Sequence, residues 1–453
     1  MLADSLGNTL SLQDPGSVSA VNDFVEGFIS CEARAVNVLR VADTDHSPIV
    51  QAYCAALHMF AESQDGPVNA RPFIDMALKG VESSVGVTSR EGRLVAAIEA
   101  WVSGDIALAI QLHEEQVRAH PRDLVSLKLG QYHLFNRGDS PGMLRLALAA
   151  LPHAADVPYA HGMTAFAWEQ CHFLEQAEAA ARKAIRMRHK EPWAHHALAH
   201  VLLTTGRITE GHVFMQEVSP TWTGLNSFMV THNWWHRALF ALELGMHDEV
   251  LRLYDTRVWG VVKDYSQDQI GAVSLLARLE LAGVDVGNRW QDVGNHLAFR
   301  LDDHVLPFLD MQYLYGLARA ARPEALTLMC NIETFAEESN AVEKAGRNAD
   351  VWRSVAAPAS RGLLAHAQGD PISAVEALGT ALPRMMEIGG SHAQRDLFEQ
   401  IHLDALMRSG QWVAAQNIVQ QRLRGQPESA RLKRQATQIY AALDLDAALA
   451  NLV

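Results

Sequence analysis

Turn signals recur along the first half of this chain at a constant spacing. Gly104, Gly138, His172 and Gly206 stand 34 residues apart (104, 138, 172, 206), and each follows an apolar run with helical periodicity. Seven residues before a turn stands a small side chain that lets two helices cross closely, namely Ala97, Ala165, Ala199 and Ala238. Each unit is therefore predicted to be a helix, a tight turn and a second helix.

A period of 34 residues is that of the tetratricopeptide repeat, in which neighbouring helix pairs stack and bury a continuous core. Beyond Gly206 the turn signals continue at Gly245, Gly283, Gly369 and Gly410 with longer spacings. Alternating strand patterns and hairpin signals are scarce, so no sheet is expected. We predict an all-α chain: a tetratricopeptide-type helix-turn-helix solenoid, strongly curved, with a right-handed superhelix.

Five segments follow from this pattern. They are a flexible arm (1–20), an N-terminal helical cap (21–89), regular 34-residue units (90–218), longer and irregular units (219–429) and a C-terminal capping helix (430–453). The stretches 219–227 and 333–350 are expected to be irregular, because polar and acidic residues interrupt the helical pattern there.

The composition excludes several classes of partner. A formal net charge of −14 disfavours a phosphate-backbone partner, so no nucleic acid is expected. The four cysteines form no C-x-x-C pair, which is typical of free thiols in a reducing cytoplasm. No window of 18 apolar residues and no signal peptide occur, so neither a membrane location nor secretion is expected. A homodimer is compatible with the sequence.

Two pairs of histidines point to a site. His196 and His200 are four residues apart, as are His232 and His236, so each pair shares one helix face. Counted from the turns, these residues and Glu169 occupy first-helix positions that typically face the groove of tetratricopeptide domains. A single histidine is more often solvated or packed in the core. Four of them, flanked by tryptophans that include Trp235, indicate a binding or catalytic pocket.

Two chemistries fit these residues. In the first, no cofactor is needed: His200 or His232 moves a proton, and Asp268 or Glu169 fixes the imidazole tautomer. In the second, His196, His200, His232 and His236 hold Zn²⁺ or another transition ion, although no H-E-x-x-H motif is present. No cofactor is predicted, and the spacing leaves the choice between the two chemistries open.

A second constellation is GGSHAQRD, residues 389–396, which opens an amphipathic helix. Ser391 is a good helix cap, and the following amides with Arg395 would form an anion-binding corner. His392 and Asp396 would add polar side chains to this corner. The plain alternative is a helix start and nothing more. A weaker candidate for the same groove is His304, which follows two aspartates.

Several stretches resemble one family. They are HHALAHVLLTTGRITEGHVFM, THNWWHRALFALELG, DQIGAVSLLARLELAGVDVGNRW, LDDHVLPFLDMQYLYGLARA and GGSHAQRDLFEQ, and together they are similar to the tetratricopeptide repeat protein 38 family over roughly residues 20–440. The resemblance implies an all-helical repeat protein and carries no established biochemical activity. The chain departs from it at Cys171-His172, where a turn glycine is common, and before Gly206, where relatives tend to have a glutamate.

The sequence thus predicts a cytoplasmic protein whose concave pocket binds, and in one version chemically transforms, a polar or anionic small molecule. Whether it is an enzyme is left open. The alternative is an adaptor that holds a peptide or partner protein in the groove. A small molecule needs a closed cavity where the His196/His200 face meets residues 392–396, whereas an adaptor needs an open channel.

Overall fold

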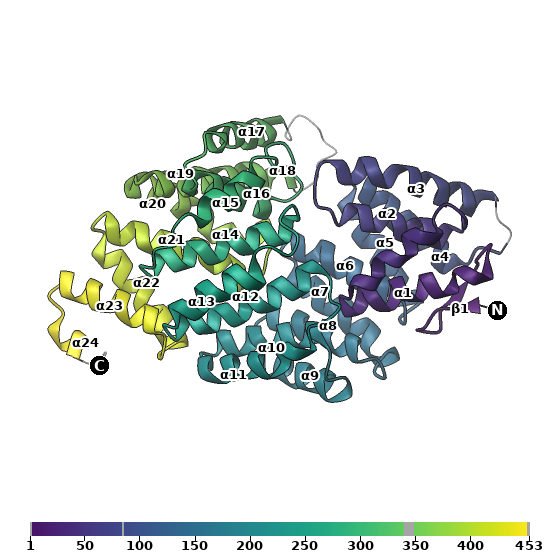
Figure 1. Cartoon of the computed structure of the whole chain (residues 1–453), viewed down its shortest axis with the longest axis horizontal. Coiled ribbons are helices and arrows are strands. Elements are labelled where there is room, and N and C mark those ends of the chain that lie inside the picture. Colours follow the sequence, from purple (N-terminus) through teal and green to yellow (C-terminus); the bar gives the residue numbers. More distant parts are fainter. Residues whose placement is uncertain (1, 84–85, 339–347, 451–453) are drawn as a thin grey trace. The chain divides into compact units, whose positions relative to one another are not determined.

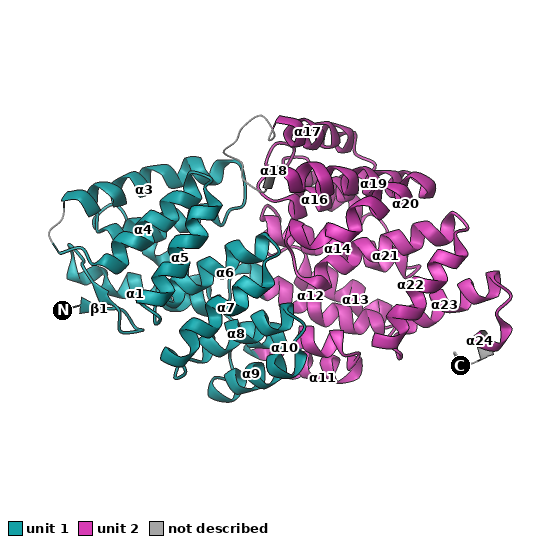
Figure 2. Ribbon diagram, turned by 180° about the vertical axis from the view of Figure 1, so that it is seen from behind, with its two compact units in different colours: residues 1–198, 221–229, 342–346 teal, residues 199–220, 230–341, 347–453 magenta. Residues whose placement is uncertain are grey.

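The computed structural model describes residues 2–83, 86–338 and 348–450, and these residues are helical almost throughout (Figure 1). Contacts divide the chain into two compact units (Figure 2). Of the described residues, unit 1 holds 2–83, 86–198 and 221–229, and unit 2 holds 199–220, 230–338 and 348–450. Each unit is described by itself below.

Unit 1 consists of successive antiparallel helix pairs. Its helices are α1 (Val18–Ser30), the 3-10 helix η2 (Ala33–Val41), α2 (Pro48–Met59), α3 (Asp65–Ser83), α4 (Ser89–Val102), α5 (Ile106–Ala119), α6 (Leu124–Asn136), α7 (Ser140–Ala150), α8 (Pro158–Gln170), α9 (Leu174–Met187) and the first half of α10 (Pro192–Thr204).

Unit 2 continues the same pattern. Its helices are the second half of α10, α11 (Ile208–Val218), α12 (Ser227–Glu243, of which the first turn belongs to unit 1), α13 (His247–Leu253), α14 (Ser266–Leu281), α15 (Arg289–Leu297), α16 (Pro307–Arg319), α17 (Glu324–Glu338), α18 (Asn348–Val351), α19 (Ala357–Gln368), α20 (Pro371–Ala381), α21 (His392–Arg408), α22 (Trp412–Gly425), α23 (Ala430–Ala442) and α24 (Asp446–Ala450).

The turns lie where the sequence period puts them. Gly104, Gly138, His172 and Gly206 have φ values of 82°, 69°, 60° and 70°, and each follows the first helix of a pair. This left-handed region favours glycine. The four alanines at the predicted helix crossings are fully buried. The prediction of an all-α, tetratricopeptide-type helix-turn-helix fold is confirmed.

A turn in unit 2 carries no glycine, and neither does the turn at His172 in unit 1. Between Gly283 and Gly369 the chain makes a further turn at Ala321, which has a φ of 52° and joins α16 to α17. An alanine gives no turn signal, which is why the sequence pattern showed one long interval there. A non-glycine residue pays roughly 1–2 kcal/mol to adopt this conformation.

Replacing this alanine with glycine is expected to stabilise the protein. Ala321→Gly removes the Cβ strain but adds chain entropy to the unfolded state, so the free energy of unfolding should rise by roughly 0.5–1 kcal/mol. Urea denaturation followed by far-UV circular dichroism measures this difference. A fall in stability would show that the alanine methyl group packs favourably at this exposed turn.

The N-terminal segment differs from the flexible arm that was expected. Leu2–Ala3 (β1) and Thr9–Leu10 (β2) form a small antiparallel hairpin, and the Ser11 hydroxyl donates to Glu91 Oε2 over 2.7 Å. Two-residue strands are too short to show an alternating pattern, so the expectation of no sheet missed them. Glu91 also accepts from the Ser11 amide, and Arg122 Nε donates to the Leu6 carbonyl. These hydrogen bonds hold the segment in place.

The two stretches expected to be irregular differ from each other. Residues 219–227 hold a 3-10 turn, Ser219–Thr221, followed by extended backbone that bridges Leu225 to Glu32. In the second stretch α17 continues to Glu338 and α18 begins at Asn348, while 339–347 lie outside the described residues. The C-terminal segment holds α23 and α24, where one capping helix was expected. None of the described helices is long and apolar enough to cross a membrane.

Unit 2 curves until its first and last helix pairs meet. The Gln426 side-chain amide donates to the Leu203 carbonyl over 3.1 Å, although 223 residues separate the two. Gly206 packs so closely on this segment that an added Cβ would lie 2.9 Å from the Gly425 carbonyl oxygen. The end of α10 is therefore joined to the connection between α22 and α23, and a pocket forms beside this junction.

Candidate ligand pocket and histidine cluster

A pocket of about 300 Å³ lies within unit 2. Its walls come from α10, α12, α14, α21, α22 and α23, so it gathers side chains from positions 203 to 431. The lining residues are Leu203, Thr204, Leu239, Leu242, Glu243, Arg278, His392, Ala393, Asp396, Glu399, Gln400, Gln421, Arg422, Gly425, Gln426 and Arg431.

Arg278 is the unusual member of this set. It sits in the apolar helix α14, is only 1% exposed, and still contributes to the pocket wall. Its guanidinium donates to the Ala393 carbonyl over 2.8 Å and to Ser274, and lies 5.4 Å from the Trp235 ring centroid. Within the described residues it forms no ion pair with a carboxylate. Burial accordingly lowers the pKa of Arg278 to about 10.

The other two arginines of the pocket are paired. Arg431 binds Glu243 over 2.9 Å, and both side chains are almost fully buried. Arg422 binds Asp396. Burial acts to raise the pKa of Asp396, but Arg422, Arg431 and then Arg278 outweigh it, so the pKa lies well below its usual value. Arg422 also pairs with Glu399 over 3.1 Å, so the wall holds three carboxylates and three arginines. Among these arginines Arg278 is the one without a direct carboxylate contact within the described residues, although Asp396 acts on it through space.

The first turn of α21 forms another part of the wall. Gly389 and Gly390 have φ values of 84° and 73°, and Ser391 caps the helix by accepting from the Gln394 amide over 3.3 Å. Gly390 is required by close packing, since a Cβ would lie 2.7 Å from the Phe308 ring. His392 and Ala393 then line the pocket, so the positive end of a long helix dipole lies at its edge.

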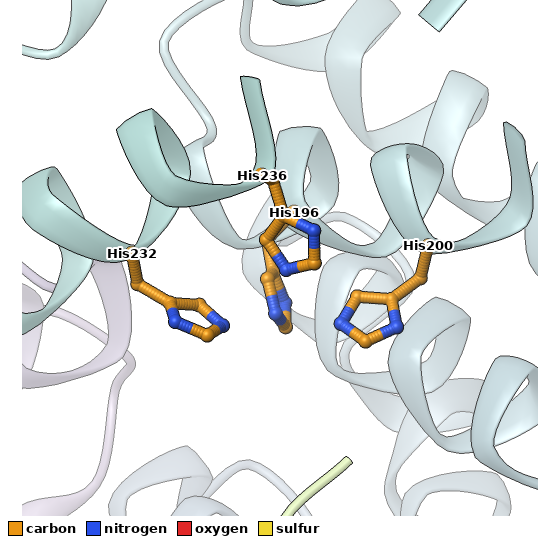
Figure 3. Close-up of side chains that lie close together, drawn as sticks. All are labelled: His196, His200, His232 and His236. Atoms are coloured by element: carbon orange, nitrogen blue, oxygen red, sulfur yellow. The ribbon is translucent and has the colours of Figure 1, made fainter. Parts of the chain in front are cut away.

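A histidine cluster lies next to this pocket. His200 on α10 and His232 and His236 on α12 each offer one ring nitrogen, and these nitrogens lie within 4.8 Å of one another. Figure 3 shows these side chains with His196; the rings of His200 and His232 turn toward that of His236. The ring centroids of His200 and His236 are 4.5 Å apart, and those of His232 and His236 are 4.8 Å apart.

His392 connects the cluster to the pocket. Its ring lies 5.4 Å from that of His200, edge to face, and its Nε2 is 3.1 Å from the Thr204 hydroxyl. The helix that carries His200 and the segment that begins at Gly389 therefore meet in unit 2, although neither His196 nor His200 lines the pocket. Burial, followed by the neighbouring His200, lowers the pKa of His232 to about 3.

Other predicted site residues have different surroundings. Arg395 donates to the carbonyls of Gly389 and Gly390 and is not part of the pocket wall, and its role as anion holder stays a prediction. His304 lies 2.6 Å from Asp310 and stacks on Phe335, outside the pocket wall. Its expected place in the groove stays a prediction.

The two predicted carboxylates are both buried. Asp268 accepts from the Thr231 hydroxyl and from the Val262 amide, each over 3.1 Å. Glu169 belongs to α8 of unit 1 and accepts from the Gln170 side chain over 2.7 Å. His196 lies one turn before His200 on α10, where its ring contacts Phe166 and Trp193 of unit 1. These contacts hold the three side chains in place and leave the proposed tautomer roles as predictions.

Sequence reasoning missed the charged residues that line the pocket, above all Arg278, Arg431 and Glu243. One signal was present: a lone arginine in the apolar run SLLARLELAG of a first helix. Arg278 stands five residues before its turn glycine, whereas His200 stands six residues before Gly206. One residue corresponds to about 100° around a helix, so counting from the turns did not place Arg278 in the groove.

No family model matches the sequence. Among solved structures, the human IFIT1 dimer with PPP-AAAA is 13% identical over the whole of this chain and 96% of that chain, with a TM-score of 0.40. The Naa15/Naa10 structure bound to HypK-THB is 12% identical over 96% of this chain and 68% of that chain, with a TM-score of 0.26. The P58(IPK) TPR domain is 10% identical over 81% of this chain and 90% of that chain, with a TM-score of 0.21. This chain is a TPR-like helical repeat protein, as its own helices and turns establish.

Proposed function

We propose that unit 2 binds a small molecule that carries an anionic group on an apolar body. The observation that carries this proposal is Arg278, a buried guanidinium in the pocket wall without a carboxylate partner. A desolvated charge without a direct ion-pair contact is costly and is typical of functional sites. An anionic ligand would supply the missing partner through charge-assisted hydrogen bonds.

The remaining walls support the same ligand class. The N-terminus of α21 adds a favourable field for an anion, and Gln400 and Gln426 add neutral polar groups. Leu203, Leu239 and Leu242 form an apolar side that would accept a hydrocarbon or ring. A volume of about 300 Å³ suits a molecule of modest size.

Acid/base chemistry is the finer form of the proposal. His392 in the wall and His200 behind it are the groups that would move a proton at a bound ligand. The adaptor is the alternative; it fits less well with a pocket whose walls come from helices far apart in sequence. From the motifs GGSHAQRD and HNWWH, we also propose that the chain is a member of the tetratricopeptide repeat protein 38 family.

Phenyl phosphate is a suitable probe, because it joins a small anion to an apolar ring. We expect it to bind with one-to-one stoichiometry in isothermal titration calorimetry, whereas phenol at equal concentration should not. Arg278→Met should weaken phenyl phosphate binding by about tenfold to a hundredfold, corresponding to the loss of a charge-assisted hydrogen bond of roughly 1.5–3 kcal/mol.

The matched control is Arg361→Met, which removes an exposed arginine of the same unit that pairs with Glu333. This variant should bind phenyl phosphate like the unmodified protein. Equal binding of phenyl phosphate and phenol, absence of binding, or an equal loss in both variants would each overturn the proposal. Titration with a peptide library in place of phenyl phosphate tests the adaptor alternative.

A further inference from the structure

We propose that His200, His232 and His236 form a binding site for a divalent late transition ion, with Zn²⁺ as the ion. The site is distinct from the pocket: none of the three residues belongs to the pocket wall. Imidazole nitrogens are ligands that zinc, copper and nickel prefer, and zinc sites with three histidines are common in proteins.

The geometry requires little rearrangement. Three ring nitrogens lie within 4.8 Å of one another, and tetrahedral zinc with Zn–N distances of about 2.0–2.1 Å needs nitrogens about 3.3 Å apart. The difference is within reach of small rotations about the side-chain torsions. His232 and His236 stand four residues apart on α12, so one helix turn already aligns two ligands.

The cluster is shielded from solvent. His200 and His236 are completely buried, and His232 is partly buried. Trp235 stacks on the His232 ring at 5.2 Å with an angle of 10° between the planes, which restrains the orientation of that ring.

The arrangement also sets the coordination number. Three ligands leave one tetrahedral position, which in catalytic zinc sites holds water or substrate and in structural sites holds a fourth side chain. The three histidines of unit 2 therefore leave one position for water or a bound molecule.

Metal content and a spectroscopic probe test the proposal together. Tag-free protein purified without chelator should contain about one equivalent of zinc by elemental analysis. After removal of the zinc, Co²⁺ alone should produce the visible d–d bands of tetrahedral nitrogen coordination, in buffer free of phosphate and of pocket ligands. Each of His200→Ala, His232→Ala and His236→Ala should weaken Zn²⁺ binding on the order of 100-fold or more, since loss of an outer-shell partner alone costs up to that much.

The control is His296→Ala, because His296 is a partly exposed histidine of the same unit that pairs with Asp264. It should retain full metal binding, which separates the cluster from the other histidines of the chain. Protein without zinc that gives no Co²⁺ bands, or a control variant that loses as much affinity as His236→Ala, overturns the proposal. If an alanine variant fails to fold, His236→Gln retains side-chain size and provides the same comparison.

Discussion

Gly211→Ala should lower the free energy of unfolding by about 3 kcal/mol, at the upper end of the usual cost of overpacking. Gly211 lies in α11 and faces the ring of Phe240 on α12, and a Cβ at this position would be 2.2 Å from Phe240 Cε1. Phe240 is fully buried, so its ring cannot move aside without disturbing its neighbours. Urea denaturation followed by far-UV circular dichroism gives the measurement.

The control for this substitution is another helical glycine in the same unit. Gly271 lies inside α14, and an added Cβ there would meet no heavy atom within 4 Å. Gly271→Ala should therefore raise the free energy of unfolding by roughly 0.5–1 kcal/mol, because alanine favours the helix and restricts the unfolded chain. The same chemical change thus has opposite effects at the two positions.

This pair of variants probes the packing of the helix pairs directly. If Gly211→Ala were as stable as the unmodified protein, α11 and α12 would not be in the close contact that a tetratricopeptide-type stack requires. Equal loss in both variants would instead indicate a general intolerance of alanine, and the argument from the Phe240 ring would be wrong.

The predictability of the fold follows from backbone chemistry. The turns at 104, 138, 172 and 206 recur because each pair needs one residue in the left-handed region, and glycine is the usual choice there. Ala321 meets the same need without glycine, so the pattern showed a long interval between Gly283 and Gly369 but did not locate the turn within it. Likewise, β1 and β2 depend on contacts with distant residues such as Glu91 and not on a local pattern.

The candidate site was only partly predictable, for a related reason. The spacing of His232 and His236 fixes a common helix face locally, and the structure brings both near His200. Arg395 donates to the glycine carbonyls at 389 and 390, and no local spacing in the sequence indicates that choice of acceptor. The pairing of Arg431 with Glu243 joins residues 188 positions apart, and no local spacing encodes it.

Arg278→Met is expected to stabilise the ligand-free protein, even though it removes a fully buried side chain. A pKa lowered from 12.5 to about 10 corresponds to roughly 3 kcal/mol of cost for keeping the charge in this site. Loss of the hydrogen bonds to Ser274 and Ala393 offsets part of that gain, by about 1–2 kcal/mol. The net expectation is an increase of about 1–2 kcal/mol in the free energy of unfolding, measured by urea denaturation without ligand.

Arg431→Met is the matched comparison, because it removes an equally buried arginine from the same pocket. Arg431 is paired with Glu243, so its loss leaves a buried carboxylate without its cation and should lower the free energy of unfolding by roughly 3 kcal/mol. A lower free energy of unfolding in Arg431→Met and a higher one in Arg278→Met would show that Arg431 stabilises the fold, whereas Arg278 lowers its stability. Since a residue kept at such a cost needs a compensating function, a stabilised Arg278→Met that no longer binds phenyl phosphate would tie that cost to ligand binding. Destabilisation of both variants by similar amounts would instead make Arg278 a structural residue and remove the main support for the anion pocket.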